Sequence, residues 1–421
     1  MERRGWQVVE ALLISGLRST LRDEVAEALE GTSLYSCMSC ATCSAGCPSS
    51  NLGPDLDPRR AVRSILLGLE DQVMSSRLVW TCTLCGRCTM HCPAGLSMPT
   101  LVRALRSRHV REGKVPGGLQ ATVDDSVRTG NNMAVTGDDF RETVEWVEEM
   151  LQSEVGDPGA RIPLDKEGAR VLYTLNPREV KYNPLTFLAV AKILHMAGED
   201  WTLGTGSWDV TNYGLFSGDD AAATLIAGRL AAEAKRLRVQ ELVAAECGHG
   251  FWAMKWGMNH WLGGVPFRVR SIVELVAEYI RDGRIVLDPS VHPQPVTYHD
   301  PCNLARKGGV VDEPRYILAH AVQEFREMYP NREHNYCCAG GGGLLSATEY
   351  AQTRLAKGEP KAEQIRATGA SIVVTACHNC LDQLADINKH YKLKVTIKNL
   401  CELVADALVR PAPEQEGEKG A

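Results

Sequence analysis

Two cysteine runs of identical spacing constrain this chain more than any other feature. Each run reads C-x2-C-x2-C-x3-C-P, and the two differ only in the residues between the cysteines. The first holds Cys37, Cys40, Cys43 and Cys47, and the second holds Cys82, Cys85, Cys88 and Cys92. The chain has 15 cysteines and no recognisable secretion signal, so tight groups of thiols indicate metal ligation rather than a disulfide framework.

The spacing is that of bacterial two-cluster ferredoxins and predicts two [4Fe–4S] cubes. Three thiolates spaced by three residues wrap one corner of a cube, and the fourth cysteine, which precedes proline, turns the chain away to the other cube. One cube is therefore expected to take Cys37, Cys40, Cys43 and Cys92, and the other Cys82, Cys85, Cys88 and Cys47. Two zinc knuckles are the alternative, but the doubled run with both prolines favours iron–sulfur clusters.

The domain organisation follows from periodicity. The segment between the runs has helical periodicity, which predicts an α-helical ferredoxin-type domain over 34–150, after an amphipathic N-terminal helix within 1–33. Past Asp165, β-rich runs (ARVLYTL, QELVAAEC, QPVTYHD, ASIVVTAC) alternate with helical stretches (NPLTFLAVAKILHMAG, SIVELVAEYIRDG), as in an α/β fold. The composition of 411–421 predicts a disordered tail.

The α/β region contains a short internal repeat. Residues 171–177, 212–218 and 244–250 align with 296–302, 335–341 and 375–380. We therefore expect two related α/β modules, over 160–288 and 289–410. At the aligned positions the second module carries Cys302, Cys337, Cys338, Cys377 and Cys380, whereas the first keeps only Cys247. Only the second module is expected to hold a cysteine-ligated cluster by itself.

The five thiols of the second module exceed what zinc or a single cube needs. Adjacent Cys337 and Cys338 point their side chains in different directions, so they could hold different irons, or one could bridge two. The glycines at 340–343 would let the backbone approach a bulky inorganic group, and they could also leave a path for a substrate. A phosphate-binding loop is excluded because no Gly-Lys-Ser/Thr follows.

These motifs resemble the CCG-domain iron–sulfur proteins of the heterodisulfide reductase family. The chain is most similar to DsrK/HdrD-like subunits of respiratory membrane complexes, including the Hmc and Tmc complexes of sulfate reducers. The resemblance is carried by both CxxCxxCxxxCP runs, VTNYGLFSGDD, ECGHG, TYHDPCNLARKGG, NYCCAGGGGLLS and CHNC. One position departs from the family: Ala339 stands where the CCG motif has glycine.

The resemblance implies that the five-cysteine set holds a noncubane [4Fe–4S] cluster that reduces or forms disulfides. It also implies a substrate, a disulfide or trisulfide on a small DsrC-like sulfur carrier. A membrane cytochrome b or quinone-interacting subunit and further complex subunits are the implied partners. The chain has no haem CxxCH motif, quinone-binding span or flavin fingerprint, so it would need those partners to complete the circuit.

Charge and hydropathy limit the cellular setting. The net charge of −6 argues against a general nucleic-acid binder. No apolar run approaches the length of a membrane span, and no export signal is recognisable at the N-terminus. We therefore expect a peripheral protein on the cytoplasmic side of the inner membrane.

Several interpretations remain open. The chain could be a pure electron relay, or an iron–sulfur subunit of the glycolate/lactate-oxidase type, although the latter usually keeps both cysteine-rich sites. His299 and His378 could supply protons to a released thiolate or hydrogen-bond to cluster sulfur. Cys401 lies in a stretch with apolar helical spacing and is expected in the core. The Trp-rich segment 251–261 could be core or a partner-binding face.

Overall fold

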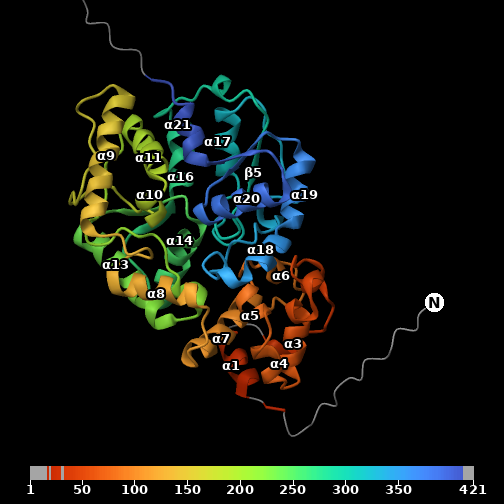
Figure 1. Ribbon diagram of the computed structural model, residues 1–421. Coiled ribbons are helices and arrows are strands. Elements are labelled where there is room, and N and C mark those ends of the chain that lie inside the picture. Colours follow the sequence, from red (N-terminus) through yellow and green to blue (C-terminus); the bar gives the residue numbers. More distant parts are fainter. Residues whose placement is uncertain (1–16, 19, 30–32, 411–421) are drawn as a thin grey trace, which may run out of the picture.

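The computed structural model describes residues 17–18, 20–29 and 33–410, which form a mixed fold of helices and parallel sheets (Figure 1). The predicted N-terminal helix lies partly outside these residues. Within it the structure has α1 (Thr20–Ala28), whose Leu21 and Val25 are buried. The predicted disordered tail also lies outside the described residues.

Short helices surround the two cysteine runs and form one end of the molecule, drawn in red and orange in Figure 1. Their bounds are α2 Thr42–Ala45, α3 Pro58–Leu66, α4 Glu70–Met74, α5 Leu78–Thr81, α6 Arg87–Met90 and α7 Met98–Arg111. The predicted helical segment between the runs is confirmed as α3, α4 and α5. Gly68 separates α3 from α4 because its φ of +75° ends the first helix.

Helices α8 (Gly117–Thr129) and α9 (Gly137–Val155) follow α7 but pack largely on the α/β region. A capping box between Thr136 and Asp139 starts α9. Its buried side chains Phe140, Val144, Val147 and Leu151 belong to the same hydrophobic core as the first sheet. Packing therefore joins α9 to the α/β region rather than to the cysteine-bearing helices.

The first sheet is parallel, with strand order β2-β1-β3-β4. Its strands are β1 Val171–Tyr173, β2 Trp201–Thr202, β3 Glu241–Ala244 and β4 Arg268–Ser271. The associated helices are α10 Pro177–Lys181, α11 Pro184–Met196, α12 Gly214–Ser217, α13 Asp220–Arg236, α14 Gly248–Trp252, α15 Met258–Leu262 and α16 Ile272–Arg281, with a π-helix over Ala253–Gly257 between α14 and α15.

The second sheet is also parallel, with strand order β5-β6-β7. Its strands are β5 Val296–His299, β6 Ile372–Thr375 and β7 Thr396–Asn399. Its helices are α17 Glu313–Ala321, α18 Ala351–Lys357, α19 Glu359–Thr368, α20 His378–Tyr391 and α21 Leu400–Asp406. The four predicted strands and both predicted helices of the α/β region are confirmed as β1, β3, β5, β6, α11 and α16.

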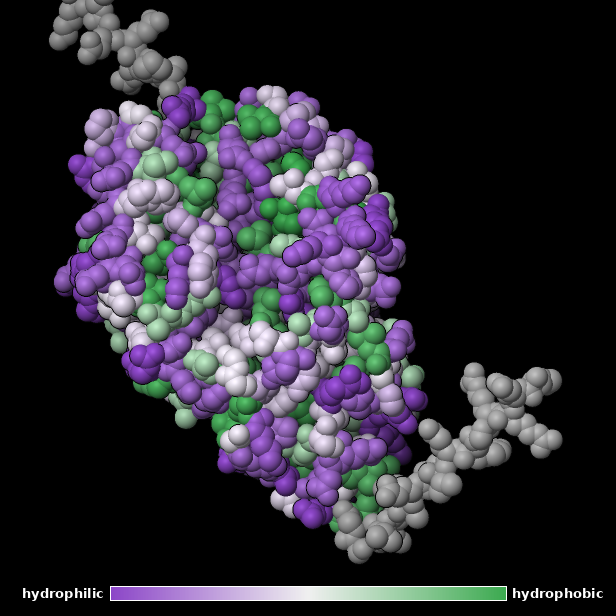
Figure 2. All heavy atoms as spheres, in the orientation of Figure 1, coloured by the Kyte–Doolittle hydropathy of each residue, from purple (hydrophilic) through white to green (hydrophobic). Residues whose placement is uncertain are grey.

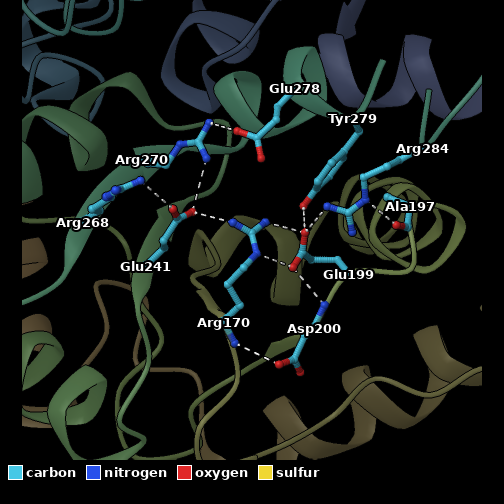
Figure 3. A network of polar contacts seen from close by, with 10 residues as sticks. All are labelled: Arg170, Ala197, Glu199, Asp200, Glu241, Arg268, Arg270, Glu278, Tyr279 and Arg284. Atoms are coloured by element: carbon cyan, nitrogen blue, oxygen red, sulfur yellow. Dashed lines mark hydrogen bonds and ion pairs between the residues drawn. The ribbon is translucent and has the colours of Figure 1, made fainter. Parts of the chain in front are cut away.

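Both sheets contribute to one hydrophobic core. Residues from the first sheet, such as Val171 and Leu242, share it with Val296 and Val374 of the second sheet. The predicted core position of Cys401 is confirmed, since its side chain is 1% exposed on α21. Behind the first sheet, a polar network around Glu199 ties the ends of several elements together (Figure 3).

The outer surface is mostly polar. On the face drawn in Figure 2, hydrophobic residues are scattered in small patches rather than gathered into one. Among the described helices, none combines the length and the apolar character that crossing a bilayer would require.

Candidate iron–sulfur centre

The eight thiols of the two runs surround two small cavities. One cavity is lined by Cys37, Cys40, Cys43 and Cys92, together with Cys88. The other is lined by Cys47, Cys82, Cys85 and Cys88. The structure therefore brings together the two crossed sets that the spacing predicted, with Cys88 lying at both cavities. Four convergent thiols around each cavity fit the ligand demand of a [4Fe–4S] cube.

The two runs adopt matching backbone conformations. Ser39 and Leu84 both have positive φ, at 58° and 52°. Ala41 and Gly86, two residues further on, have φ of 68° and 78° and begin the short helices α2 and α6. Left-handed residues at the same two places curl each run, so that successive thiols face one point. The same curl in both runs explains why each triplet of cysteines converges.

The first cavity lies near the molecular surface. Cys40 is exposed, and its neighbour Met38 is 70% exposed. Tyr35, just before the run, is 63% exposed. A redox partner that contacts this face would approach the first set of thiols directly. We call this set the distal site, and the set around Cys82, Cys85, Cys88 and Cys47 the proximal site.

The five cysteines of the second α/β module converge in the interior. All five are buried, and they form one cluster of side chains with Cys85 packed against it. The Sγ atoms of Cys338 and Cys380 lie 3.4 Å apart. Cys302 follows β5, Cys377 follows β6, and the Cys337–Cys338 pair comes from the loop between these strands. Such a buried, all-thiol donor set fits an iron–sulfur cluster; we call it the C-terminal site.

Mutual contacts prepare some of these thiols for metal binding. The pKa of Cys337 is lowered chiefly because the Cys302 thiol donates a hydrogen bond to it. The pKa of Cys377 is lowered chiefly by a hydrogen bond from the Cys380 thiol. Thiolate is the form of cysteine that binds metal, so both shifts favour ligation.

Backbone amides also point at the adjacent cysteines. The N–H of Ala339 donates to Cys337 Sγ at 3.3 Å, and the N–H of Gly340 donates to Cys338 Sγ at 3.4 Å. Ala339 has φ of 76°, a left-handed conformation that costs a residue with a Cβ. Hydrogen bonds to cluster sulfur are one of the factors that set the potential of such clusters.

His299 and His378 are both buried, but they lie in different surroundings. No hydrogen-bond partner for either ring nitrogen of His299 occurs within the described part of the chain. A ring nitrogen lies within 4.8 Å of the sulfurs of Cys338 and Cys380. Burial holds the pKa of His299 well below its usual value, so the ring is neutral and has one N–H to donate. His378 instead faces Glu179, 3.5 Å away, and its pKa is raised even though burial opposes the shift.

The glycine tract at 340–343 does not leave an open path, contrary to one of our sequence-based expectations. A Cβ at Gly340 would lie 2.7 Å from Gln383 Cβ, and one at Gly342 would lie 2.6 Å from Cys82 O. A Cβ at Gly343 would lie 2.8 Å from Leu119 Cδ1. The glycines are needed because this loop packs directly on the loop of the second cysteine run and on α8 and α20.

This packing joins the proximal and C-terminal sites. The Cys85 thiol is in hydrogen-bonding contact with Cys337. Arg306 holds the two loops together, since its guanidinium donates to Cys85 O at 2.8 Å and to Asn335 O at 2.6 Å. The three thiol sites therefore form a continuous row, with Cys88 between the first two and Cys85 beside the third.

A surface groove of about 980 Å³ runs along the proximal end of this row. Gly86, Arg306 and Lys307 line it, and so do Trp252 and Trp256, which stack with ring centroids 5.8 Å apart. Of the two interpretations of segment 251–261, each holds for part of it. Phe251, Ala253, Met254 and Met258 are buried in the core, whereas the two indoles face the groove.

Cys247, the thiol kept by the first module, is buried at the start of α14. Its sulfur accepts from Gly250 N at 3.4 Å and contacts Asn176 Nδ2 at 3.6 Å, which is the arrangement of a helix cap. Its pKa is raised, mainly by burial and by the nearby Cys377. Among the described residues, no other thiol of the first module lies beside it.

Sequence reasoning missed three cations that lie close to the thiols: Arg106, Arg306 and Lys307. Arg106 sits in α7, where an arginine with helical spacing looks like an ordinary surface residue. Arg306 and Lys307 follow Cys302 within the RKGG stretch, and only the contact between loops shows where they point. The nearness of Arg306 and Lys307 to a cysteine motif was the available signal.

Comparisons with known proteins agree with this arrangement. Residues 33–96 match a family described as a 4Fe-4S dicluster domain. Residues 296–385 match the cysteine-rich CCG domain. The first match covers both cysteine runs, and the second covers all five thiols of the C-terminal site.

Curated relatives carry related names. An "Hdr-like menaquinol oxidoreductase iron-sulfur subunit 2" of Archaeoglobus fulgidus is 27% identical over 365 residues, which cover 76% of this chain and 65% of that protein. A dihydromethanophenazine:CoB–CoM heterodisulfide reductase subunit of Methanosarcina barkeri is 28% identical, with 75% and 74% covered. A "probable membrane-anchored ferredoxin" of Chromohalobacter salexigens is 26% identical, with 90% and 60% covered.

The alignments thus leave about a third of the Archaeoglobus protein unmatched. The matched part includes both cysteine-rich regions, with the 4Fe-4S dicluster domain at the N-terminal end and the CCG domain at the C-terminal end. The chain is therefore homologous to heterodisulfide reductase-like iron–sulfur subunits, and it combines a 4Fe-4S dicluster domain with a cysteine-rich CCG domain.

Proposed function

We propose that this protein is an electron-transfer subunit of an oxidoreductase, in which the two cubes feed a third cluster that makes or breaks sulfur–sulfur bonds. The observation that carries the proposal is the continuous row of thiols from exposed Cys40 to the buried C-terminal site. Cys85 in contact with Cys337 places the proximal and C-terminal sites side by side. Electrons would pass singly along this row, and the names of the relatives agree with such a role.

The ligands are assigned as the sequence suggested. Cys37, Cys40, Cys43 and Cys92 would hold the distal cube, and Cys82, Cys85, Cys88 and Cys47 the proximal cube. Cys302, Cys337, Cys338, Cys377 and Cys380 would hold a noncubane [4Fe–4S] cluster. The clusters supply the electron-transfer chemistry. The chain's own part is to bury the proximal and C-terminal sites, aim amide N–H groups at the sulfurs of Cys337 and Cys338, and keep the sites adjacent.

The substrate would be a disulfide or trisulfide on a small DsrC-like thiol protein. Its reduction to two thiols consumes two electrons and two protons. The groove lined by Trp252, Arg306 and Lys307 is the route to the thiol row that the structure offers, in place of the glycine tract. Lys307 lies within electrostatic reach of Cys302 and Cys85, so its cation would stabilise a thiolate released there.

The partners and setting are part of the same proposal. A membrane cytochrome b or quinone-interacting subunit would dock near Met38 and Tyr35, where the distal site meets the surface. The chain would then be a peripheral subunit on the cytoplasmic side of the inner membrane, in a complex of the kind found in sulfate respiration.

We further propose that the two α/β modules are duplicates and that the first has lost its cluster. Two similarities support this. In each module a central strand, β3 or β6, is followed by a cysteine that begins a helix, Cys247 or Cys377. In each, the edge strand β4 or β7 runs directly into a helix with a capping box.

Iron and sulfide analysis of anaerobically prepared protein tests the cluster assignment. Three full clusters correspond to about twelve irons per chain. Zinc in place of iron at either N-terminal run would reject the electron-transfer row. EPR spectra with and without an oxidised thiol substrate then separate the two remaining functions: a signal that changes on addition of substrate supports sulfur chemistry, whereas an unchanged signal supports a pure relay.

A further inference from the structure

Arg106 is the largest side chain that the described fold buries completely. It projects from α7, and its guanidinium donates only to backbone carbonyls. The acceptors are Val79 O at 2.7 Å, Trp80 O at 3.4 Å, Cys82 O at 2.7 Å, Phe216 O at 2.6 Å and Gly342 O at 2.8 Å. One side chain thus joins the second cysteine run, the first α/β module and the glycine loop of the second.

The charge of this guanidinium is not matched by a nearby carboxylate. Burial lowers the pKa of Arg106 only to about 10, so the group remains a cation at neutral pH. Of the described groups close enough to affect it, Cys82 is the one whose negative charge would stabilise it most. A buried charge without a counter-ion is costly, and a fold retains it only where another charge compensates it.

Arg103, one turn earlier on the same helix, shows the ordinary arrangement. It also reaches the first module, donating to Leu215 O at 3.0 Å, but it pairs with the carboxylate of Asp220 at 2.6 Å. The two arginines therefore make similar contacts between parts of the chain, and they differ in whether a counter-ion is present.

We propose that Arg106 is a positioning residue whose counter-ion is the cluster at the proximal site, and that its charge raises the potential of that cluster. The inference rests on the proposed function, because it requires an iron–sulfur cluster at this site. Reduction adds one negative charge to the cluster, and a fixed cation a short distance away stabilises the reduced state more than the oxidised state. Net charge and burial around a cluster are known determinants of its potential.

Two substitutions separate the charge from the packing. Arg106→Gln removes the cation but keeps an amide that can donate to carbonyls, and Arg106→Lys keeps the cation with fewer donors. The proximal cube is followed by EPR in an anaerobic redox titration. In Arg106→Gln, the ratio of reduced to oxidised cube at the wild-type midpoint should fall at least tenfold, equivalent to 59 mV for one electron. Arg106→Lys should stay within threefold of wild type, and the distal cube should not shift in either variant.

Arg103→Gln is the matched control, and it should leave the proximal potential unchanged. Equal shifts in Arg106→Gln and Arg106→Lys, or a wild-type potential in Arg106→Gln, would overturn the proposal. Loss of proximal iron from the glutamine variant alone would support it, because the retained charge then decides cluster binding. Loss from both variants would assign the role to packing and reject it. A wild-type protein without a proximal EPR signal would instead reject the cluster assignment itself.

Discussion

The thiol of Cys85 lies in hydrogen-bonding contact with the thiol of Cys337, so the second cysteine run and the CC pair meet at one point in the core. Arg306 reinforces this meeting by donating to the carbonyls of Cys85 and Asn335. Electron transfer between the proximal and C-terminal sites would cross this contact. The predictions below ask whether the contact, and the loops that build it, behave as the structure indicates.

Cys247 should be dispensable for cluster binding. Its sulfur caps α14 and has no second thiol of its own module beside it, so Cys247→Ala should cost about 1 kcal/mol of stability as a lost cap. Iron content and thiol-dependent activity should stay near wild type. Cys377→Ala is the matched change at the corresponding position of the second module, and it should remove the C-terminal EPR signal while both cubes remain reducible. Loss of iron from Cys247→Ala would mean that the first module holds a ligand.

The contact between the glycine loop and the second run should be sensitive to a single methyl group. Gly342→Ala would place a Cβ 2.6 Å from Cys82 O at a φ of +66°, and should cost about 2 to 4 kcal/mol from the clash and the left-handed strain. Gly309→Ala is the control, because Gly309 has φ of +80° with nothing within 4 Å. Chemical denaturation compares the two variants. Equal losses of stability would show that strain alone operates and that the loops do not pack as described.

Ala339 should be more stable as glycine, the residue that the CCG motif has at this position. Its φ of 76° is left-handed, which costs about 1–2 kcal/mol for a residue with a Cβ, while the buried methyl group contributes about 0.8 kcal/mol. Ala339→Gly should therefore be neutral or stabilising by up to about 1 kcal/mol. Ala347→Gly, at a buried alanine with φ of −94°, should be destabilising. A destabilisation of the same size at both positions would contradict this account.

Lys307 should affect sulfur chemistry more than cluster content. Its ammonium lies over the Trp252 ring, 5.4 Å from the centroid, at the groove and within reach of Cys302 and Cys85. If the cation stabilises a released thiolate, Lys307→Gln should lower kcat/KM for a disulfide substrate about tenfold, equivalent to about 1.4 kcal/mol. The exposed Lys114→Gln is the control. A fall in iron content that accounts for the whole loss of activity would assign Lys307 a purely structural role.

The network around Glu199 should make the fold sensitive to acid (Figure 3). Burial alone would raise the pKa of Glu199, but hydrogen bonds from Arg170 and Tyr279 outweigh it and lower the pKa to about 2. Because the folded pKa lies below the unfolded one, the stabilisation is complete above about pH 4.5 and is lost as the pH falls toward 2. We expect about 2 kcal/mol, allowing for solvent screening.

Unfolding free energies at pH 3 and pH 6 test this point. Glu199→Gln should lose stability at pH 6 and match wild type more closely at pH 3. Glu324→Gln, which removes an exposed partner of Arg326, should change little at either pH. A difference between Glu199→Gln and wild type that does not depend on pH would exclude titration of Glu199 as the cause.

Sequence by itself determined the local features. The cysteine spacings predicted the two crossed sets of thiols, because three residues between thiolates and a proline after the fourth are short-range constraints. Four strands and two helices of the α/β region followed from hydropathy. Strands β4 and β7 were missed because RVRS and TIKN carry charged or polar residues at partly exposed positions, so that no apolar run marks them.

Tertiary structure decided how these local pieces meet. The glycines at 340–343 looked like an opening, but they are small because two loops from distant parts of the chain pack there at backbone distance. Arg106 resembled a surface cation on a helix until the fold placed five carbonyls from three segments around it. Such contacts depend on which segments the fold brings together, and no spacing along the chain encodes them locally.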